Sequence, residues 1–493
     1  MSTSSISLSP ISLSIPQHQD TRPKGACVDC KRLKKRCDRA SPACTNCAKA
    51  SRTCEFKDLS EDGLLSPISS AKSIDTLTFG TLLDILITKQ RVKEAVTLYF
   101  RGVNTWFTIV EKASYERQLD TAWDKLPAEA SVLALCMALM ARPPNQKSSK
   151  IGDTVYHTTK AILGLVQSKA PMSVPLLQAE LLVAMYEFSQ SMPQQAYLSL
   201  GRCLQMTKAF GWHGAVFWAE DRKASMARDL KLYSILWWAI VYLDCLLNVG
   251  YQDQTFPMHT AGLEAVSMIP LPENFDQHLA SSSPFQLGAQ GQEQGFRDSN
   301  GDRIEGMIVP EATSAWYLSR VLEQLSDPAL PGNVDTKTLS TMIWQHAQDI
   351  SAAKWRAGDR NAAVGTDLIA LMKLNHPGLL GGADPLSLLS DPQAVQRIRV
   401  LTTVIHGKAG KIAASEHRLS TGVEAPCWAF AMSYASLLLI SHGNGVLQDA
   451  DWFSRVENLM TSIEKVSKRW IIAARYCETV KIALENRLNG YAQ

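Results

Sequence analysis

Apolar residues recur at helical spacing along most of this chain. From Thr76 to the C-terminus they return every three or four positions, whereas the strict alternation typical of a half-buried strand is scarce. Between Asp449 and Trp470, large apolar residues fall on one helical stripe, at Trp452, Val456, Leu459, Ile463, Val466 and Trp470. The stripe predicts a folded amphipathic helix with a capping aspartate, in preference to an acidic activation segment.

The most apolar stretch of the chain covers residues 232–249. It contains Asp244 and Asn248 and is marginal in length for a membrane span, so we predict a buried helix and no membrane segment. Trp237 and Trp238 lie within it. We expect both indole rings to pack in the core and not to line a ligand pocket, because large aromatic side chains dominate core packing.

Breaks in the helical pattern divide the chain. Residues 1–22 are rich in Ser and Pro and are predicted to be disordered, residues 23–57 hold a cysteine-rich module, and residues 58–75 form a polar linker. Residues 76–493 are predicted to form a large all-α domain, with a loop at about 281–306 that is short of large aliphatic side chains. A boundary between two helical subdomains at this loop is the alternative interpretation.

The charge of the chain is unevenly placed. Arg22 to Lys57 contains eleven Lys and Arg residues against three acidic ones, a net charge of +8. The remainder carries 39 basic and 44 acidic residues, a net charge of −5. A short basic segment on a mildly acidic body indicates that the segment contacts a polyanion and that the body does not.

Six of the eleven cysteines fall within 28 consecutive residues. Two copies of the unit C-x2-C-x6-C, joined by six residues, place them at Cys27, Cys30, Cys37, Cys44, Cys47 and Cys54. The other five are scattered through apolar sequence, which is not the pattern of a secreted disulfide framework. The first twenty residues also lack the basic segment and uninterrupted apolar run of a signal peptide, so we expect a reducing, intracellular compartment.

The cysteine spacing favours zinc over disulfides or buried free thiols. Zinc prefers four tetrahedral ligands, and each unit offers three thiolates. If one cysteine of each unit bridges both ions, six sulfurs supply eight ligations, four for each of two zinc ions. No coordination position then stays open for water, so the zinc is structural and catalysis there is not expected. The predicted fold is therefore mostly α, with a small N-terminal two-zinc six-cysteine cluster module and a large all-α helical domain.

The segment CVDCKRLKKRCDRASPACTNCAKASRTC resembles the DNA-binding module of the fungal Zn(2)-Cys(6) binuclear cluster transcription factors. It matches all six cysteines and every spacing of that family, together with Asp38 and Pro42. The resemblance implies that Cys27 and Cys44 are the bridging thiolates. It also implies that the helix after the second cysteine directs basic residues into the major groove at a CGG-like triplet.

Lys34 stands at the position that the family uses to read bases, four residues after the second cysteine. Lysine suits this role because it reaches the O6 and N7 acceptors of guanine in the major groove. Leu33 departs from the family, which often has a basic residue there, so a contact is either missing or taken over by Lys35. The neighbouring cations are expected to hold phosphates, namely Lys31, Arg32, Lys35, Arg36 and Arg39. The same basic run can serve as a nuclear localisation signal.

Three segments of the body resemble the middle-homology domain of the same family, at residues 99–119, 196–213 and 236–252. Thr108 replaces a common Pro of that domain, and Cys245 replaces its usual Arg. This resemblance implies that residues 76–493 are a regulatory domain. Beyond about residue 310 we predict only helices.

These observations predict a nuclear, sequence-specific DNA-binding transcription regulator that is not an enzyme. Activation of RNA polymerase II transcription, and control of one metabolic or biosynthetic gene cluster, are expectations from the family. The expected partner is double-stranded DNA, with a homodimer and co-activators as further partners; residues 77–100 offer barely two uneven heptads for a coiled coil. The rival hypotheses are an enzyme that its zinc cluster localises, and a zinc-stapled protein adaptor. The chain has no Walker A loop, dinucleotide fingerprint or nucleophile elbow, and the basic run argues against an adaptor.

Overall fold

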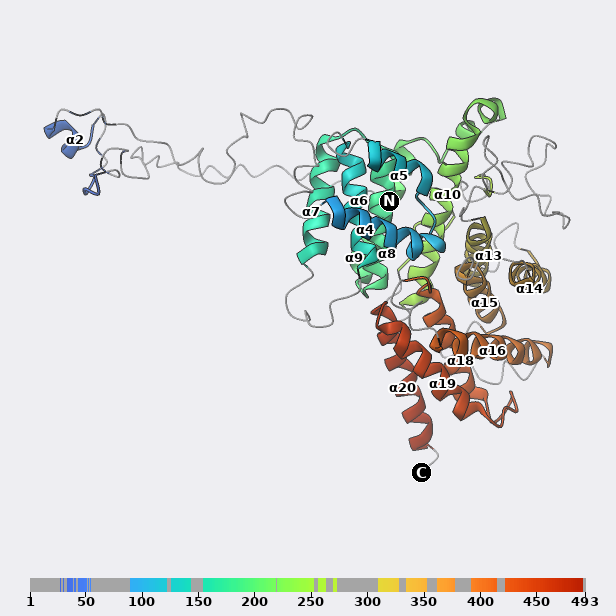
Figure 1. Ribbon diagram of the computed structural model, residues 1–493. Helices are drawn as coiled ribbons and strands as arrows, with labels where there is room; N and C mark the ends of the chain where they lie inside the picture. The colour runs from blue at the N-terminus through green and yellow to red at the C-terminus, as the bar shows by residue number, and fades with distance from the viewer. Residues whose placement is uncertain are drawn as a thin grey trace, which may run out of the picture. The chain divides into compact units, whose positions relative to one another are not determined.

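The computed structural model divides the chain into two compact units, residues 1–76 and 77–493 (Figure 1). The described residues are 27, 30, 33–38, 40, 43–50, 52, 54, 89–121, 126–142, 154–218, 220–251, 256–262, 269–272, 309–327, 334–352, 361–376, 392–414 and 422–490. The predicted tail at 1–22, linker at 58–75 and loop at 281–306 lie outside them. The domain bounds given above therefore stay predictions.

The described part of the larger unit is built from helices and contains no strand, as the sequence predicted. Its first seven α-helices are α4 (Lys89–Arg101), α5 (Lys112–Thr121), α6 (Ala128–Ala141), α7 (Thr154–Lys169), α8 (Val174–Ser189), α9 (Pro193–Ala209) and α10 (Glu220–Gly250). The others are α13 (Val309–Ser326), α14 (Thr336–Ala352), α15 (Asn361–Asn375), α16 (Pro392–Ala413), α18 (Cys427–His442), α19 (Trp452–Ser467) and α20 (Ile472–Gly490). Short 3₁₀ turns are η1 (Val103–Thr105) and η3 (Ala215–Trp218).

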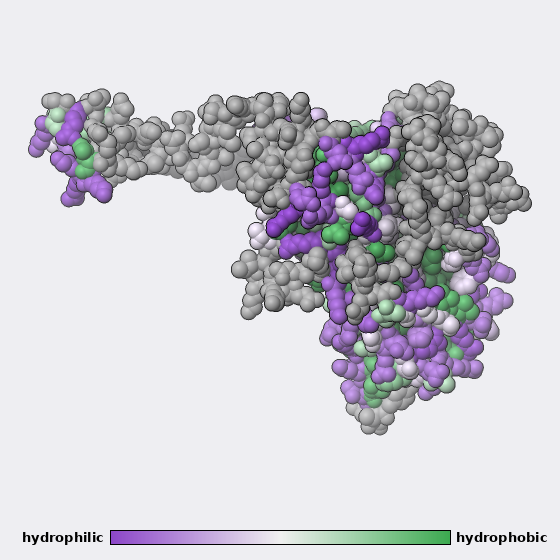
Figure 2. All heavy atoms as spheres, viewed as in Figure 1, coloured by the Kyte–Doolittle hydropathy of each residue, from purple (hydrophilic) through white to green (hydrophobic). Residues whose placement is uncertain are grey.

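One hydrophobic core runs through the larger unit. Helices α4 and α6–α9 form one group, α16 and α18–α20 form another, and α10, α13 and α15 connect them (Figure 1). Helices α6, α8 and α18 are mostly apolar and buried along nearly their whole length, which places them at the centre of these groups. Figure 2 shows hydrophilic side chains over most of the described surface in that view. Because buried side chains from Val92 to Leu484 form one cluster, a single helical domain is the simpler interpretation.

Helix α10 contains the apolar stretch that the sequence predicted to be a buried helix. Its segment Asp229–Gly250 is long and apolar enough to cross a bilayer, yet 83% of its most apolar 18-residue window is buried inside the protein. Trp237 and Trp238 are buried, which confirms their place in the core. The carboxylate of Asp244 accepts hydrogen bonds from the backbone N–H (2.8 Å) and the hydroxyl (2.7 Å) of Thr260. The apolar stretch is therefore part of a core helix, and its buried Asp244 is satisfied within the fold.

The predicted amphipathic helix is α19, and five of the six stripe residues lie on it with buried side chains. Trp470 is also buried but follows the end of the helix. The prediction that an aspartate caps this helix is wrong. Asp451 occupies the N-cap position without a side-chain hydrogen bond, because its ψ of 11° departs from the extended conformation in which capping side chains reach the first turn. Asp449 instead accepts a hydrogen bond from the Asp451 N–H (3.1 Å) and pairs with Arg455.

A buried arginine after α19 connects the C-terminal group of helices to α6 in the N-terminal group. The guanidinium of Arg469 donates hydrogen bonds to the carbonyl oxygens of Met140 and Arg142, at the C-terminal end of α6. It also lies 4.6 Å from the ring centroid of Trp470, which meets Trp106 edge-on at 6.0 Å. Burial lowers the pKa of Arg469 to about 10, so the side chain stays charged at neutral pH. One cation thereby satisfies carbonyls that α6 leaves without partners of its own.

Candidate zinc centre and nucleic-acid interface

The six cysteines belong to two units that are related by a shift of 17 residues and share one backbone hydrogen bond at equivalent positions. In the first unit the N–H of Lys35 donates to the carbonyl of Cys30 (2.9 Å). In the second unit the N–H of Arg52 donates to the carbonyl of Cys47 (3.0 Å), at the equivalent positions. A hydrogen bond across five residues is a common way to end a helix. The repeat seen in the sequence is thus also a repeat of local structure.

The aspartate after the third cysteine ties the two units together. Helix α2 (Thr45–Lys49) begins the second unit, with Cys44 at its N-cap. The carboxylate of Asp38 accepts hydrogen bonds from the hydroxyl and the backbone N–H of Thr45, the latter at 3.0 Å. These two bonds lower the pKa of Asp38, the hydroxyl contributing most. A carboxylate is favourable here because the N–H groups of a first helical turn carry partial positive charge.

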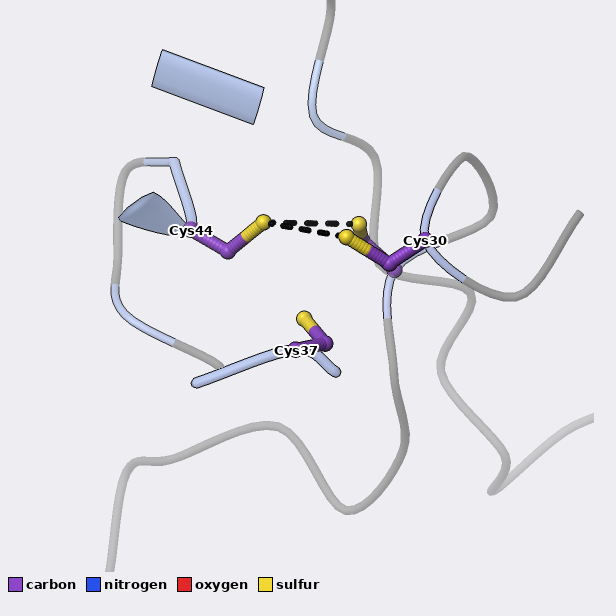
Figure 3. Close-up of side chains that lie close together, drawn as sticks. Cys30, Cys37 and Cys44 are labelled. Atoms are coloured by element: carbon purple, nitrogen blue, oxygen red, sulfur yellow. Dashed lines mark hydrogen bonds between the residues drawn. The ribbon is translucent and has the colours of Figure 1, made fainter. Parts of the chain in front are cut away.

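The sulfur atoms lie at distances that suit tetrahedral zinc. The Sγ of Cys44 is 3.6 Å from the Sγ of Cys30 (Figure 3) and 3.6 Å from that of Cys27. Zn–S bonds of about 2.3 Å place the corners of a tetrahedron about 3.8 Å apart. The sulfurs form two groups of four, each within 4.8 Å: Cys27, Cys30, Cys37 and Cys44, and Cys27, Cys44, Cys47 and Cys54. The groups have Cys27 and Cys44 in common.

Burial and hydrogen bonding divide the thiols. Cys27, Cys30, Cys44 and Cys47 are buried, and Cys37 and Cys54 are half-buried. The backbone N–H of Cys30 lowers the pKa of Cys27, whereas burial raises the pKa of Cys30 to about 12. Zinc binding replaces these protons, and two zinc ions would oppose six thiolates to leave a formal charge of −2. The neighbouring lysines and arginines offset that charge.

The described candidates for DNA contact lie on a turn at the surface of the module. Lys34, Lys35 and Arg36 are exposed, and Lys34 has a φ of 50°, in the left-handed region that normally favours glycine. Lys34 therefore ends the helix that includes Cys30 and does not continue it. The remaining candidates, Lys31, Arg32 and Arg39, lie outside the described residues.

Sequence reasoning missed two cations of the second unit. Lys49 is the last residue of α2 and Arg52 is the repeat equivalent of Lys35, and both are exposed. The signal that could have found them is the 17-residue repeat, which places Arg52 at the same point of the second unit as Lys35 holds in the first.

Comparison with known proteins agrees with the architecture of both units. The Fungal Zn(2)-Cys(6) binuclear cluster domain matches residues 25–62, and the Fungal specific transcription factor domain matches residues 96–327. Transcription factor BOA15 of Botryotinia fuckeliana (strain B05.10) is 29% identical over 130 residues, which are 26% of this chain and 72% of that protein. Oleate activated transcription factor 3 of Kluyveromyces lactis is 25% identical over 159 residues, 29% of this chain and 23% of that protein. Both matched families are families of transcription factors and not of enzymes.

Proposed function

We propose that this chain, which matches the Fungal Zn(2)-Cys(6) binuclear cluster domain over residues 25–62, reads a CGG-like triplet of DNA through the first cysteine unit. It is a DNA-binding transcription regulator, and its N-terminal module is of the type that binds two zinc ions. The observation that carries the finer proposal is the exposed basic turn beside the cysteine cluster.

Our proposal for the metal centre assigns one zinc ion to each group of four sulfurs. Cys27 and Cys44 then bridge both ions, and the other cysteines each bind one. The support is geometric, because these two sulfurs are the members that the groups share. Zinc in this site would be structural, because sulfur would fill all four positions of each ion, and it would hold the basic turn in place.

Base reading is assigned to Lys34. The support is its exposed side chain at a helix terminus, from which a long cation can enter the major groove while the backbone stays outside. Lys35 and Arg36 flank it and would bind phosphates, together with Lys31, Arg32 and Arg39. A regulator with this basic run is expected in the nucleus.

The helical body is proposed to carry regulation. Val92 and Val96 of α4 are buried in the core of the larger unit, so this part of the segment 77–100 is not free to form a coiled coil. We therefore propose that the chain binds a single triplet as a monomer, or dimerises through the body. Activation through co-activators, and target genes in one metabolic or biosynthetic cluster, follow from the family resemblance alone.

Selection of binding sites from a random DNA pool with the full chain tests this function. The expected result is enrichment of a CGG-like triplet, followed by a mobility shift of the selected duplex that a scrambled duplex does not show at equal salt. Chelation of zinc should abolish the shift, because the basic turn then loses its support. Enrichment of no sequence, or equal binding of selected and scrambled duplexes, would refute sequence reading and favour the adaptor hypothesis.

A further inference from the structure

A second basic surface lies in the cysteine module, between its two units. A hollow of about 200 Å³, here called the basic hollow, is lined by Cys30, Leu33, Lys35, Asn46, Cys47, Lys49, Ala50 and Arg52. Three pairs among these residues are equivalent under the 17-residue repeat: Cys30 with Cys47, Leu33 with Ala50, and Lys35 with Arg52. The two cysteine units therefore line the basic hollow with residues at equivalent positions of the repeat.

The charges around the basic hollow have one sign. Lys35, Lys49 and Arg52 are exposed cations, and none of the described residues that line it is acidic. The side-chain amide of Asn46 donates to the carbonyl of Arg36, so Asn46 serves as a wall and the three cations remain as donors. Leu33, which interrupts the basic run, lines the same space.

Two explanations compete for these cations. A cation near a helix C-terminus is favourable by itself, and Lys49 ends α2. That effect accounts for one cation at each helix end, but it does not require cations of both units to surround one hollow. A group of Lys and Arg around a concave surface is the arrangement that binds a phosphate, where several N–H donors converge on its oxygens.

We propose that the basic hollow binds one phosphate of the DNA backbone, with Lys49 and Arg52 of the second unit as its principal ligands and Lys35 as the third. This inference rests on the proposed function. A contact of this kind carries no sequence information; it fixes the register of the module on the duplex, so that Lys34 of the first unit can reach its base.

The test uses the full chain with the double substitution Lys49→Gln and Arg52→Gln. Affinity for the selected duplex and for a scrambled duplex should fall by the same factor, because a phosphate contact is independent of sequence. The slope of log affinity against log salt should fall by the amount expected for about one phosphate contact. Raising salt from 50 to 200 mM should therefore reduce the DNA affinity of the variant by a factor about 3.5-fold smaller than for the wild type. Lys337→Gln, an exposed position on α14, removes one charge outside the module and should change neither quantity.

A scan of neutral methylphosphonate groups along the selected duplex locates the phosphate. A methylphosphonate at one position of the duplex should weaken DNA binding by the wild type and leave binding by the double variant unchanged. Native mass spectrometry must find the same zinc content in both proteins, so that a collapsed cluster is not mistaken for a lost contact. Failure of the wild type to prefer the selected duplex would refute the proposed function itself.

With that preference intact, three results would overturn the basic hollow as a phosphate site. The first is that the double variant shows the same salt dependence and the same methylphosphonate profile as the wild type. The second is loss of discrimination between sequences, which would make these residues base readers. The third is saturable binding of inorganic phosphate to the wild type but not to the variant, without any methylphosphonate effect, which would assign the basic hollow to a free anion.

Discussion

Replacing Cys44 with serine should release both zinc ions. Cys44 belongs to both groups of four sulfurs, so its loss leaves each ion with three thiolates. Cys37 belongs to one group only. The substitution Cys37→Ser removes a ligand from one ion and leaves the other group complete, which makes it the matched control.

The magnitude follows from the number of ligands. Structural zinc sites bind with roughly 10–16 kcal/mol, or about 2.5–4 kcal/mol for each of four ligands. Loss of one thiolate should therefore lower the affinity for an ion about 70- to 900-fold. Cys44→Ser imposes this loss on both ions, whereas Cys37→Ser imposes it on one. Serine is a poor replacement because its hydroxyl is not ionised at neutral pH.

Native mass spectrometry during a chelator titration measures the outcome directly. The wild type should hold two zinc ions to high chelator concentration. Cys37→Ser should lose its first zinc early and pass through a species with one zinc, whereas Cys44→Ser should lose both early. The shared-ligand reasoning is refuted if the wild type holds a single zinc. It is equally refuted if Cys44→Ser retains one zinc with wild-type affinity, or if both variants lose both ions at the same chelator concentration.

Three further predictions concern DNA reading, the fold and its pH dependence. Lys34→Ala should cost about 1–3 kcal/mol at one guanine and relax discrimination there, whereas Arg36→Ala should weaken all duplexes alike, as binding to a panel of single-base variants would reveal. Arg469→Ala should destabilise the larger unit by about 3–5 kcal/mol through two lost charged hydrogen bonds, and Arg469→Lys by less; equal denaturation midpoints for both variants and the wild type would contradict this. Burial lowers the pKa of His376 from 6.5 to about 4, so its contribution to stability is complete above 6.5 and falls as the pH drops towards 4. His376→Gln should reduce the change of melting temperature with pH in that range. An unchanged pH profile would show that other groups control the pH dependence.

The cysteine cluster and the stripe of α19 could be predicted because both are encoded at short range. Metal spacing depends on residues fewer than thirty positions apart, and the periodicity of a helix repeats within one turn. The buried part of α10 was also predictable, since Asp244 and Asn248 are set among long apolar runs in residues 232–249. In each case the chemistry of neighbouring residues determines the structure.

Contacts between distant parts of the chain were not predictable from these patterns. Arg469 bonds to a carbonyl 327 positions away, and nothing near it in the sequence marks that partner. The left-handed turn at Lys34 was missed for another reason. The residue type disfavours that conformation, and the hydrogen bond from Lys35 to Cys30 across the turn accompanies it. The expected cap of α19 failed because the backbone of Asp451 is not extended, a feature that the residue type does not reveal.

The two cysteine units share an equivalent backbone hydrogen bond but differ in charge, and this difference supports the separate roles that we propose for them. Between its second and third cysteines the first unit carries KRLKKR, whereas the second carries AKASRT. The equivalent of Lys34 is Ser51, whose short neutral side chain cannot reach guanine as a lysine does. The equivalent of Lys35 is Arg52, which keeps a cation suited to phosphate. On our proposals, each copy of the repeat would supply part of the zinc site, base reading would fall to the first unit, and both units would contact the DNA backbone.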